Sequence, residues 1–147
     1  MIHSSYSSEG LHRLLPHRHP LLLVDRIDVL EPGKHVVGMK LLSASEWWAQ
    51  EDRAAAFPFT LVLEALAQAS GALIAGLTVG AQGAIAYFMG ADHVRFRAPA
   101  RAGDRLSLDV TLLQWRRGIC RTRGVARLTD GSVVTTAQLT TIIRGVA

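Results

Sequence analysis

Two polar side chains that could do chemistry, Glu64 and Gln68, interrupt a long apolar stretch at residues 60–80. They stand four residues apart, so on a helix they share one face. A carboxylate on a buried helix is costly unless it has a partner or a task. Glu64 is therefore a candidate for acid–base catalysis or for polarising a substrate, and Gln68 for holding Glu64 or contacting the substrate. The alternative is a paired carboxylate with a structural role only.

The stretch that carries these two residues has the length and composition of one buried helix. Leucine, isoleucine and alanine fill it, and a helix that is apolar nearly all round must be buried nearly all round. At ~1.5 Å per residue it would be about 30 Å long, enough to cross a bilayer. Glu64, Gln68 and the amphipathic segments that follow argue against a membrane span, so we expect a core helix.

Composition predicts a single domain over residues 1–147. The chain of 147 residues is 49% hydrophobic and 19% charged, which is typical of a globular protein with a sizeable core. Its formal net charge of +4 favours an acidic partner or substrate. The lone Cys120, which we expect to pack in the core, excludes an internal disulfide. Six His residues without metal-ligand spacing predict no metal site, and the lack of a signal-peptide pattern predicts a cytoplasmic protein.

Around the long helix, periodicity predicts one short helix and six strands. The short helix spans residues 9–15, and residues 14–20 (LLPHRHP) form a rigid connector. Residues 43–59 show no strand alternation and predict a connection with one helical turn near Trp47 and Trp48. The strands are expected at residues 21–30, 35–42, 84–98, 106–116, 119–128 and 133–143.

This order of elements predicts an α+β fold. The first two strands would pair as a hairpin, and the last four would form an antiparallel meander. A curved sheet wrapped around one long helix covers that helix on one side only. The remaining apolar face and the sheet edges therefore predict a dimer.

Four segments of the chain resemble, in the right order, the FabZ-type 3-hydroxyacyl-[acyl-carrier-protein] dehydratases of the hot-dog fold. These segments are LLPHRHPLLLVDRI (14–27), LVLEALAQASG (61–71), YFMGADHVRFRAPARAGDRL (87–106) and RRGICRTRGVARLTDGSVVTTA (116–137). The resemblance implies a dimer with a tunnel at its interface, which takes an acyl chain on the phosphopantetheine arm of an acyl carrier protein. It also implies loss of water from a 3-hydroxyacyl thioester in fatty-acid or polyketide-type synthesis, without a cofactor or a metal.

The resemblance assigns a catalytic pair, of which this chain carries one member. Glu64 falls on the family's helix Glu, which handles the departing hydroxyl. Counted back without gaps, Gln50 falls on the family's catalytic His, which takes the C2 proton, and no His lies between His35 and His93. Phe59 falls on the family's Gly before the helix, where its backbone N–H could still stabilise an oxyanion. Because Gln is not a useful base, reduced or altered activity is implied.

Other residues fall on family positions in the connector and the tunnel wall. The family's equivalent of His17 fixes the connector, and a replacement base from His17 or His19 is a further hypothesis. Trp47, Trp48 and Phe57 are expected to cap the tunnel or the dimer interface. The expected substrate contacts are Gln68, Phe57, Pro58, Tyr87, Phe88 and His17.

Arginine is frequent in the second half of the chain. One interpretation is a solvated sheet face, and another is a docking surface for the acidic carrier protein and its phosphate. We expect docking by Arg95 and Arg97 beside the tunnel. No aromatic platform or recognition helix accompanies the charge, so nucleic-acid binding is not expected.

Three functional hypotheses remain open. The first is a dehydratase-like protein acting on acyl-carrier-protein thioesters, with Glu64 retained and the His role filled otherwise or lost. The second is a hot-dog thioesterase, in which Glu64 activates water or attacks the thioester, Gln50 helps to orient the nucleophile, and the Phe59 N–H holds the oxyanion. The third is a non-catalytic partner that supplies Glu64 or structure to a dehydratase subunit bearing the His. The dimer is accordingly a homodimer or a heterodimer with a paralogue.

Overall fold

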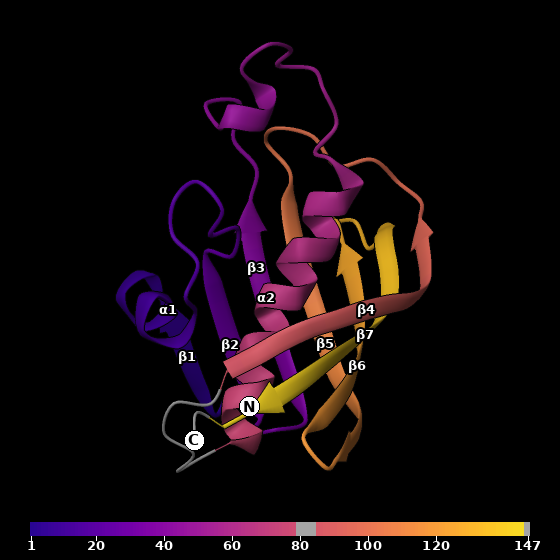
Figure 1. The fold of residues 1–147 in the computed structure, drawn as a ribbon. Helices are drawn as coiled ribbons and strands as arrows, with labels where there is room; N and C mark the ends of the chain where they lie inside the picture. The colour runs from indigo at the N-terminus through magenta and orange to yellow at the C-terminus, as the bar shows by residue number, and fades with distance from the viewer. Residues whose placement is uncertain (79–84, 146–147) are drawn as a thin grey trace.

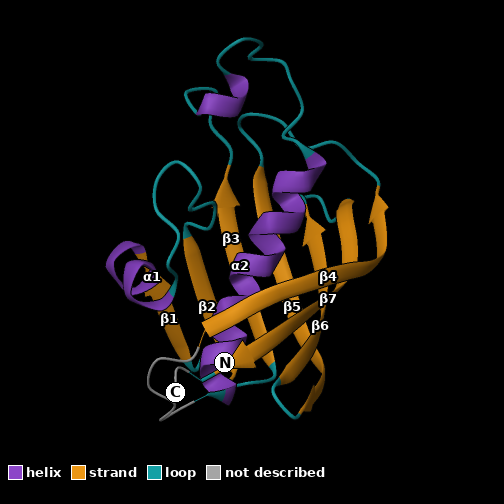
Figure 2. Cartoon of the chain, viewed as in Figure 1, coloured by secondary structure: helices purple, strands orange, loops and turns teal. Residues whose placement is uncertain are grey.

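A computed structural model describes residues 1–78 and 85–145 of the chain. Within this part the chain folds into helices and strands that Figure 2 distinguishes by colour. In chain order they are β1 (Ser4–Ser7), α1 (Ser8–Leu14), β2 (Arg26–Glu31), β3 (His35–Leu41), the 3₁₀ turn η1 (Trp47–Ala49), α2 (Phe59–Leu77), β4 (Ile85–Phe96), β5 (Arg105–Arg116), β6 (Ile119–Arg127) and β7 (Val133–Arg144).

The strands form one antiparallel sheet with the order β1-β2-β3-β5-β6-β7-β4. The sheet curls around α2, so that β4 and the end of β7 pass in front of the helix in Figure 1 and contact it. The expected α+β architecture, an antiparallel sheet around one long helix, is confirmed. The four-strand meander was wrong, because β4 pairs with β7 at the far edge instead of leading into β5. Alternation identifies which residues face the core, but it does not identify the neighbours of a strand.

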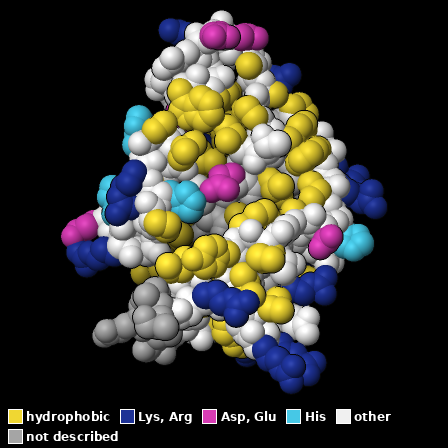
Figure 3. All heavy atoms as spheres, viewed as in Figure 1, with side chains coloured by type: hydrophobic (Ala, Val, Ile, Leu, Met, Phe, Trp, Pro, Cys, Tyr) yellow, Lys and Arg dark blue, Asp and Glu magenta, His cyan; other side chains and the backbone are white. Residues whose placement is uncertain are grey.

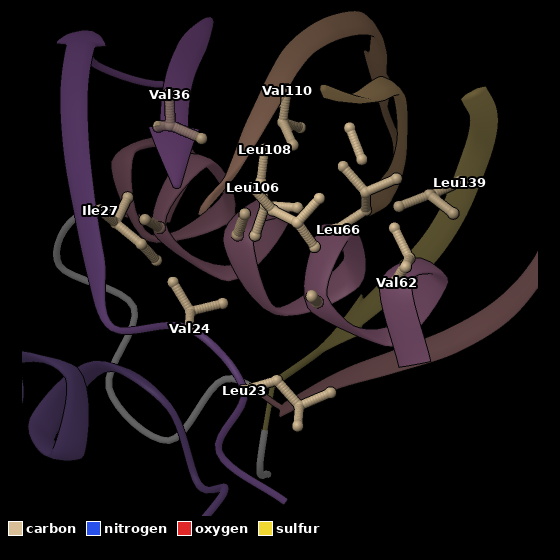
Figure 4. Close-up of a cluster of buried hydrophobic side chains, with 14 of the residues drawn as sticks. Leu23, Val24, Ile27, Val36, Val62, Leu66, Leu106, Leu108, Val110 and Leu139 are labelled. Atoms are coloured by element: carbon tan, nitrogen blue, oxygen red, sulfur yellow. The ribbon is translucent and has the colours of Figure 1, made fainter. Parts of the chain in front are cut away.

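The core lies between the concave face of the sheet and one side of α2 (Figure 4). Its members are buried aliphatic side chains, because removing apolar surface from water is the main favourable term in folding. From α2 they include Val62, Leu66 and Leu73, and from the sheet Ile27, Val36, Leu106, Leu108, Val110 and Leu139. By length and composition α2 could cross a membrane, but half of its most apolar window is buried against its own sheet, as expected for a core helix.

Most element boundaries agree with the prediction to within a few residues. The short helix and the helical turn near Trp47 are both present as α1 and η1. Strand β1 was missed, since its sequence SSYS has no apolar alternation, and it pairs with β2 at the sheet edge. The predicted helix end near Gly80 and the strand start at Ala84 lie outside the described residues.

Strand β2 begins later than expected, at Arg26, so residues 21–25 are not part of it. This apolar run has strand composition, and Leu23 is buried as a core strand residue would be. However, the backbone groups of Leu21 and Leu23 bond to the side chain of Gln68, and the run meets β3 at Asp25, whose N–H donates to the Met39 carbonyl. The run therefore belongs to the connector between α1 and β2.

Two glycines let α2 approach the segments around it. A Cβ on Gly71 would lie 2.5 Å from Leu15 Cδ2, at the start of the connector. A Cβ on Gly76 would lie 2.5 Å from the backbone nitrogen of Gly33, which itself has φ +68° in the β2–β3 turn. The absence of side chains at these positions fixes how closely the helix packs on the connector and on the turn.

Candidate active site

Glu64 lies on the side of α2 that the sheet does not cover. Its side chain is 42% exposed, whereas Ala65 and Leu66, next along the helix, are fully buried. In Figure 3 an acidic side chain and a histidine lie side by side over α2, and hydrophobic side chains surround them. Glu64 is the one acidic residue of α2. The helix is thus buried on the sheet side, and Glu64 sits on a half-open apolar surface. Such a surface is what a second subunit or an acyl chain would cover.

Gln68 holds Glu64 from one helical turn away. Gln68 is buried, with only 2% of the residue exposed. Gln68 Oε1 accepts the backbone N–H of Leu23 at 2.9 Å, and Nε2 donates to the carbonyl of Leu21 at 2.8 Å and to Glu64 Oε1 at 2.9 Å. Because the Leu23 N–H can only donate, the amide orientation is set by its partners. The expectation that Gln68 holds Glu64 therefore agrees with this geometry.

His17 reaches the same carboxylate oxygen from the connector. Its Nε2 lies 3.1 Å from Glu64 Oε1. Its Nδ1 is buried and has no hydrogen-bond partner among the described residues. The sequence placed His17 among the substrate contacts, but the structure brings it into direct contact with the candidate catalytic residue.

The connector that carries His17 is itself held at several points. Arg18 donates from its guanidinium to the backbone carbonyls of Leu15, His17 and His12, at 2.9, 2.8 and 3.0 Å. Leu15 is buried against α2. These contacts leave the His17 side chain little freedom to move away from Glu64.

The loop between β3 and α2, residues 42–58, does not approach Glu64 through Gln50. Gln50 is exposed at the end of η1, beyond the N-terminal end of α2 (Figure 1). Phe57 is 1% exposed and packs edge-on against Trp48, with ring centroids 5.1 Å apart, and Lys40 Nζ lies 5.7 Å from its ring centre. Phe57, expected to line the tunnel, is therefore enclosed in its own subunit, where it anchors the loop. Trp47 is exposed and donates from Nε1 to the Pro20 carbonyl at 3.3 Å.

The N-terminal end of α2 carries Pro58 and Phe59. The Pro58 carbonyl accepts the first helical N–H groups, from Leu61 at 2.9 Å and Val62 at 3.2 Å. Phe59 is the first residue of α2, so its N–H has no intrahelical acceptor, and none of the described residues accepts it. Its ring stacks on Phe96 of β4, with centroids 4.9 Å apart.

Strand β4 presents an exposed edge on the same side of the molecule. Its large hydrophobic residues are about half exposed, and a contiguous group of exposed large apolar side chains typically marks an interaction surface. They are Ile85, Tyr87, Phe88, Met89 and Phe96. Arg95 and Arg97, the candidate docking residues, are exposed at the end of β4 beside the Phe59–Phe96 stack.

Residues outside this region have structural explanations. Cys120 is buried, and burial raises the pKa of its thiol to about 11, which disfavours the nucleophilic thiolate. His35 Nε2 lies 3.0 Å from Asp109 Oδ2. Among the described residues no group of three or more His, Cys, Asp or Glu side chains could hold a metal ion.

Two residues that shape the surroundings of the site, Phe96 and Lys40, were missed in the sequence analysis. Lys40 is 3% exposed and donates from Nζ to Glu46 Oε2 at 2.9 Å, which ties the loop to β3. An inward Lys on a strand with buried Val36 and Gly38 was a usable signal, since a buried Lys requires a partner. Phe96 carried no such signal, because its contact with Phe59 depends on how the sheet curls.

Comparisons with known proteins agree with this fold. The family model of the FabA-like domain matches residues 15–138. The chain is 44% identical over 130 residues to the 3-hydroxyacyl-[acyl-carrier-protein] dehydratase FabZ of Vibrio cholerae, covering 86% of this chain and 84% of that protein. It is 45% identical over 128 residues to the FabZ of Roseiflexus castenholzii, covering 86% of this chain and 88% of that protein.

Solved structures share the fold at lower sequence identity. The dehydratase heterocomplex ApeI:P from Xenorhabdus doucetiae aligns with a TM-score of 0.75 and 21% identity, over 92% of this chain and 91% of that one. A hypothetical thioesterase from Streptococcus pneumoniae, solved with coenzyme A, aligns with a TM-score of 0.63 and 15% identity, over 81% of this chain and 86% of that one.

Proposed function

This chain belongs to the FabA-like family, with FabZ dehydratases as its relatives, and we propose that it acts on 3-hydroxyacyl thioesters of acyl carrier protein. In the active dimer it is the subunit that supplies Glu64. The base that takes the C2 proton comes from the loop of a second, FabZ-type subunit. The single observation that carries this proposal is the contrast between Glu64, which two side chains hold, and Gln50, which is exposed and is not a base.

The reaction needs a base for the C2 proton and an acid for the C3 hydroxyl. Glu64 gives its proton to the hydroxyl as the C3–O bond breaks, and the electron pair of the C2–H bond forms the C2=C3 double bond. Water and the 2-enoyl thioester leave. The Phe59 N–H at the helix N-terminus holds the thioester oxygen while negative charge builds on it.

The exposed surfaces around Glu64 support a paired arrangement. The free edge of β4 would join a partner strand, which covers the exposed hydrophobic side chains and removes an open sheet edge. Pro58, Tyr87 and Phe88 then line the tunnel, Glu64 stands at its acidic end where Gln68 and His17 hold it, and Phe57 supports the wall from inside. In a homodimer both sites contain Gln50 and lack the base.

Complementation between two incomplete subunits tests this proposal. The partner is a FabZ dehydratase whose helix Glu has been changed to Gln, so that its own dimer has the base and lacks the acid. We expect either protein alone to be slow, by about 10²–10⁴-fold relative to an intact dehydratase. Co-expressed, they should form a mixed dimer that converts a 3-hydroxyacyl carrier-protein thioester to the enoyl product.

The matched control for this experiment is the same mixture with Glu64→Gln in this chain, which should be inactive. A homodimer of this chain that turns over at the rate of an intact dehydratase would overturn the role of the partner. Release of free thiol, with no enoyl product, would instead indicate a thioesterase that uses Glu64.

Carrier-protein docking by Arg95 and Arg97 has its own test in the same mixed dimer. Because the carrier protein is acidic, changing both residues to Glu should raise KM for the carrier-bound substrate about tenfold at low salt. A short thioester without the carrier protein should be unaffected. Arg116→Glu combined with Arg117→Glu is the matched control, since both arginines are exposed at the opposite end of the sheet, where β5 turns into β6. An equal loss in the control variant would point to general charge and not to docking.

A further inference from the structure

We infer that His17 is a positioning residue, which with Gln68 fixes Glu64 Oε1 as a hydrogen-bond acceptor and so assigns the transferable proton of Glu64 to Oε2. The inference rests on the proposed function, because it concerns how Glu64 delivers a proton there. This role differs from the three earlier expectations for His17, which were fixing the connector, contacting the substrate and replacing the base.

Both contacts of the carboxyl group converge on a single oxygen. Gln68 Nε2 lies 2.9 Å and His17 Nε2 lies 3.1 Å from Glu64 Oε1. The Gln68 atom is certain to be a donor, because Oε1 of that amide already accepts the Leu23 N–H. Within the described residues, Glu64 Oε2 has no hydrogen-bond partner.

The surroundings of His17 decide which of its nitrogens carries the proton. Its Nδ1 is buried without a hydrogen-bond partner in the part of the chain that the structure describes. A buried N–H without an acceptor costs more than a buried lone pair on an aromatic nitrogen, so we place the hydrogen on Nε2. The Nε2–H group then donates to Glu64 Oε1. His17 therefore cannot act as the missing base, since one nitrogen is occupied and the other is enclosed.

When the carboxyl group carries a proton, that proton is on Oε2, because Oε1 already accepts two hydrogen bonds. When the substrate hydroxyl leaves, the Oε2–H bond breaks and the proton joins the departing oxygen, which gives water. The negative charge left on Glu64 is shared with Oε1, where hydrogen bonds to a charged acceptor are stronger than those to a neutral one. The clamp formed by His17 and Gln68 thus aims the acid and stabilises the product carboxylate.

The tautomer can be observed directly in the full chain, without any activity. Nitrogen-15 NMR of side-chain imidazoles distinguishes the protonated nitrogen from the nitrogen that bears the lone pair, and His17→Gln identifies the His17 signals by their loss. We expect the neutral imidazole of His17 to carry its hydrogen on Nε2. A hydrogen on Nδ1 would overturn the inference.

The positioning role is tested in the mixed dimer by replacing His17 with side chains that differ in length and in their ability to donate a hydrogen bond to Glu64. His17→Leu removes the donor and should lower kcat about 10-fold to 100-fold with little change in KM, the usual size of a hydrogen bond to a charged group. His17→Gln places an amide N–H near the position of Nε2 and should restore most of kcat. His17→Asn is too short and should not. Rescue by Gln and not by Asn separates positioning from a merely structural role.

His12→Leu is the matched control, because His12 is exposed on α1 and its side chain should not affect kcat. Melting temperatures of all variants show whether each one folds. If the mixed dimer is inactive even with wild-type His17, the proposed function fails and the NMR result alone decides the tautomer. If the mixed dimer is active and His17→Leu matches the wild type, the inference fails and the proposed function stands.

Discussion

Two segments flank the helix that carries Glu64, and they are built in opposite ways. The connector between α1 and β2 is tied to α2 by polar contacts that end at Glu64, through Gln68 and His17. The loop between β3 and α2 is held by the packing of Phe57 against Trp48 and by the ion pair of Lys40 with Glu46. None of the contacts described for the loop reaches Glu64.

This difference shows how one half of a catalytic site can persist without the other. Polar contacts that converge on a carboxylate position it for proton transfer, whereas an aromatic anchor only fixes the course of the loop. The exposed Gln50 at the end of η1 adds no proton acceptor. Under the proposed function, the chain therefore supplies the acid and its partner supplies the base.

Restoring a base to the loop should give the largest expected effect, a rise in the dehydration rate, because the loop would then contribute to the reaction as the connector does. Gln50→His combined with Phe59→Gly gives both subunits of a homodimer a base and opens the start of α2. We expect dehydration by the homodimer to rise about 10²–10⁴-fold. The measurement is formation of the enoyl product, and the triple variant with Glu64→Gln is the control that should stay inactive. No gain would mean that more of the loop than these two positions is altered.

Breaking the aromatic anchor should loosen the loop and leave the connector intact. Phe57→Ala removes a fully buried ring, which typically costs about 3–5 kcal/mol of unfolding free energy. Urea denaturation measures this loss. The backbone N–H of residue 57 bonds to the Ala100 carbonyl, and its hydrogen exchange should become faster in the variant. Exchange of the Leu23 N–H should change less. Equal acceleration at both amides would contradict the independence of the two segments.

The reciprocal change breaks the connector's polar contacts. Gln68→Leu keeps the volume roughly constant but leaves the Leu23 N–H and the Leu21 carbonyl without partners, at a cost of about 1–3 kcal/mol for the buried Leu23 N–H. Here the Leu23 N–H should exchange faster while the amide at Phe57 stays protected. If the Leu23 amide keeps its protection, the hydrogen bond to Gln68 is not what holds the connector.

The smallest expected effect is on the free energy of unfolding when Cys120, in the sheet behind both segments, is replaced. Burial raises the pKa of its thiol to about 11, from 9.0. Because the folded pKa is the higher one, the stabilising contribution is fully present below about pH 9 and is lost as the pH rises toward 11. Cys120→Ala should cost about 1 kcal/mol and remove this part of the pH dependence. Parallel denaturation curves between pH 8 and about 11 check it, and identical pH slopes would contradict it.

The long helix and most strands were predictable because their signals are local. The apolar run around Glu64 and Gln68 marks a core helix, and alternation marks the strands from β3 onward, apart from β4's place in the order. Leu21 and Leu23 misled the strand prediction, because composition cannot show that their backbone groups bond a side chain of α2. Phe57 misled the site prediction, because an aromatic residue has the same sequence pattern whether it lines a tunnel or fills a core.

The sequence by itself determined the helix, the position of its one carboxylate and the absence of a histidine in the segment before it. Those features depend on residue types at fixed spacings along a chain. Only the tertiary structure decided that β4 closes the far edge of the sheet, that Phe57 turns inward, and that His17 meets Glu64. Such contacts join residues far apart in the chain, so they arise from the curl of the sheet and the packing of the connector, which no local pattern encodes.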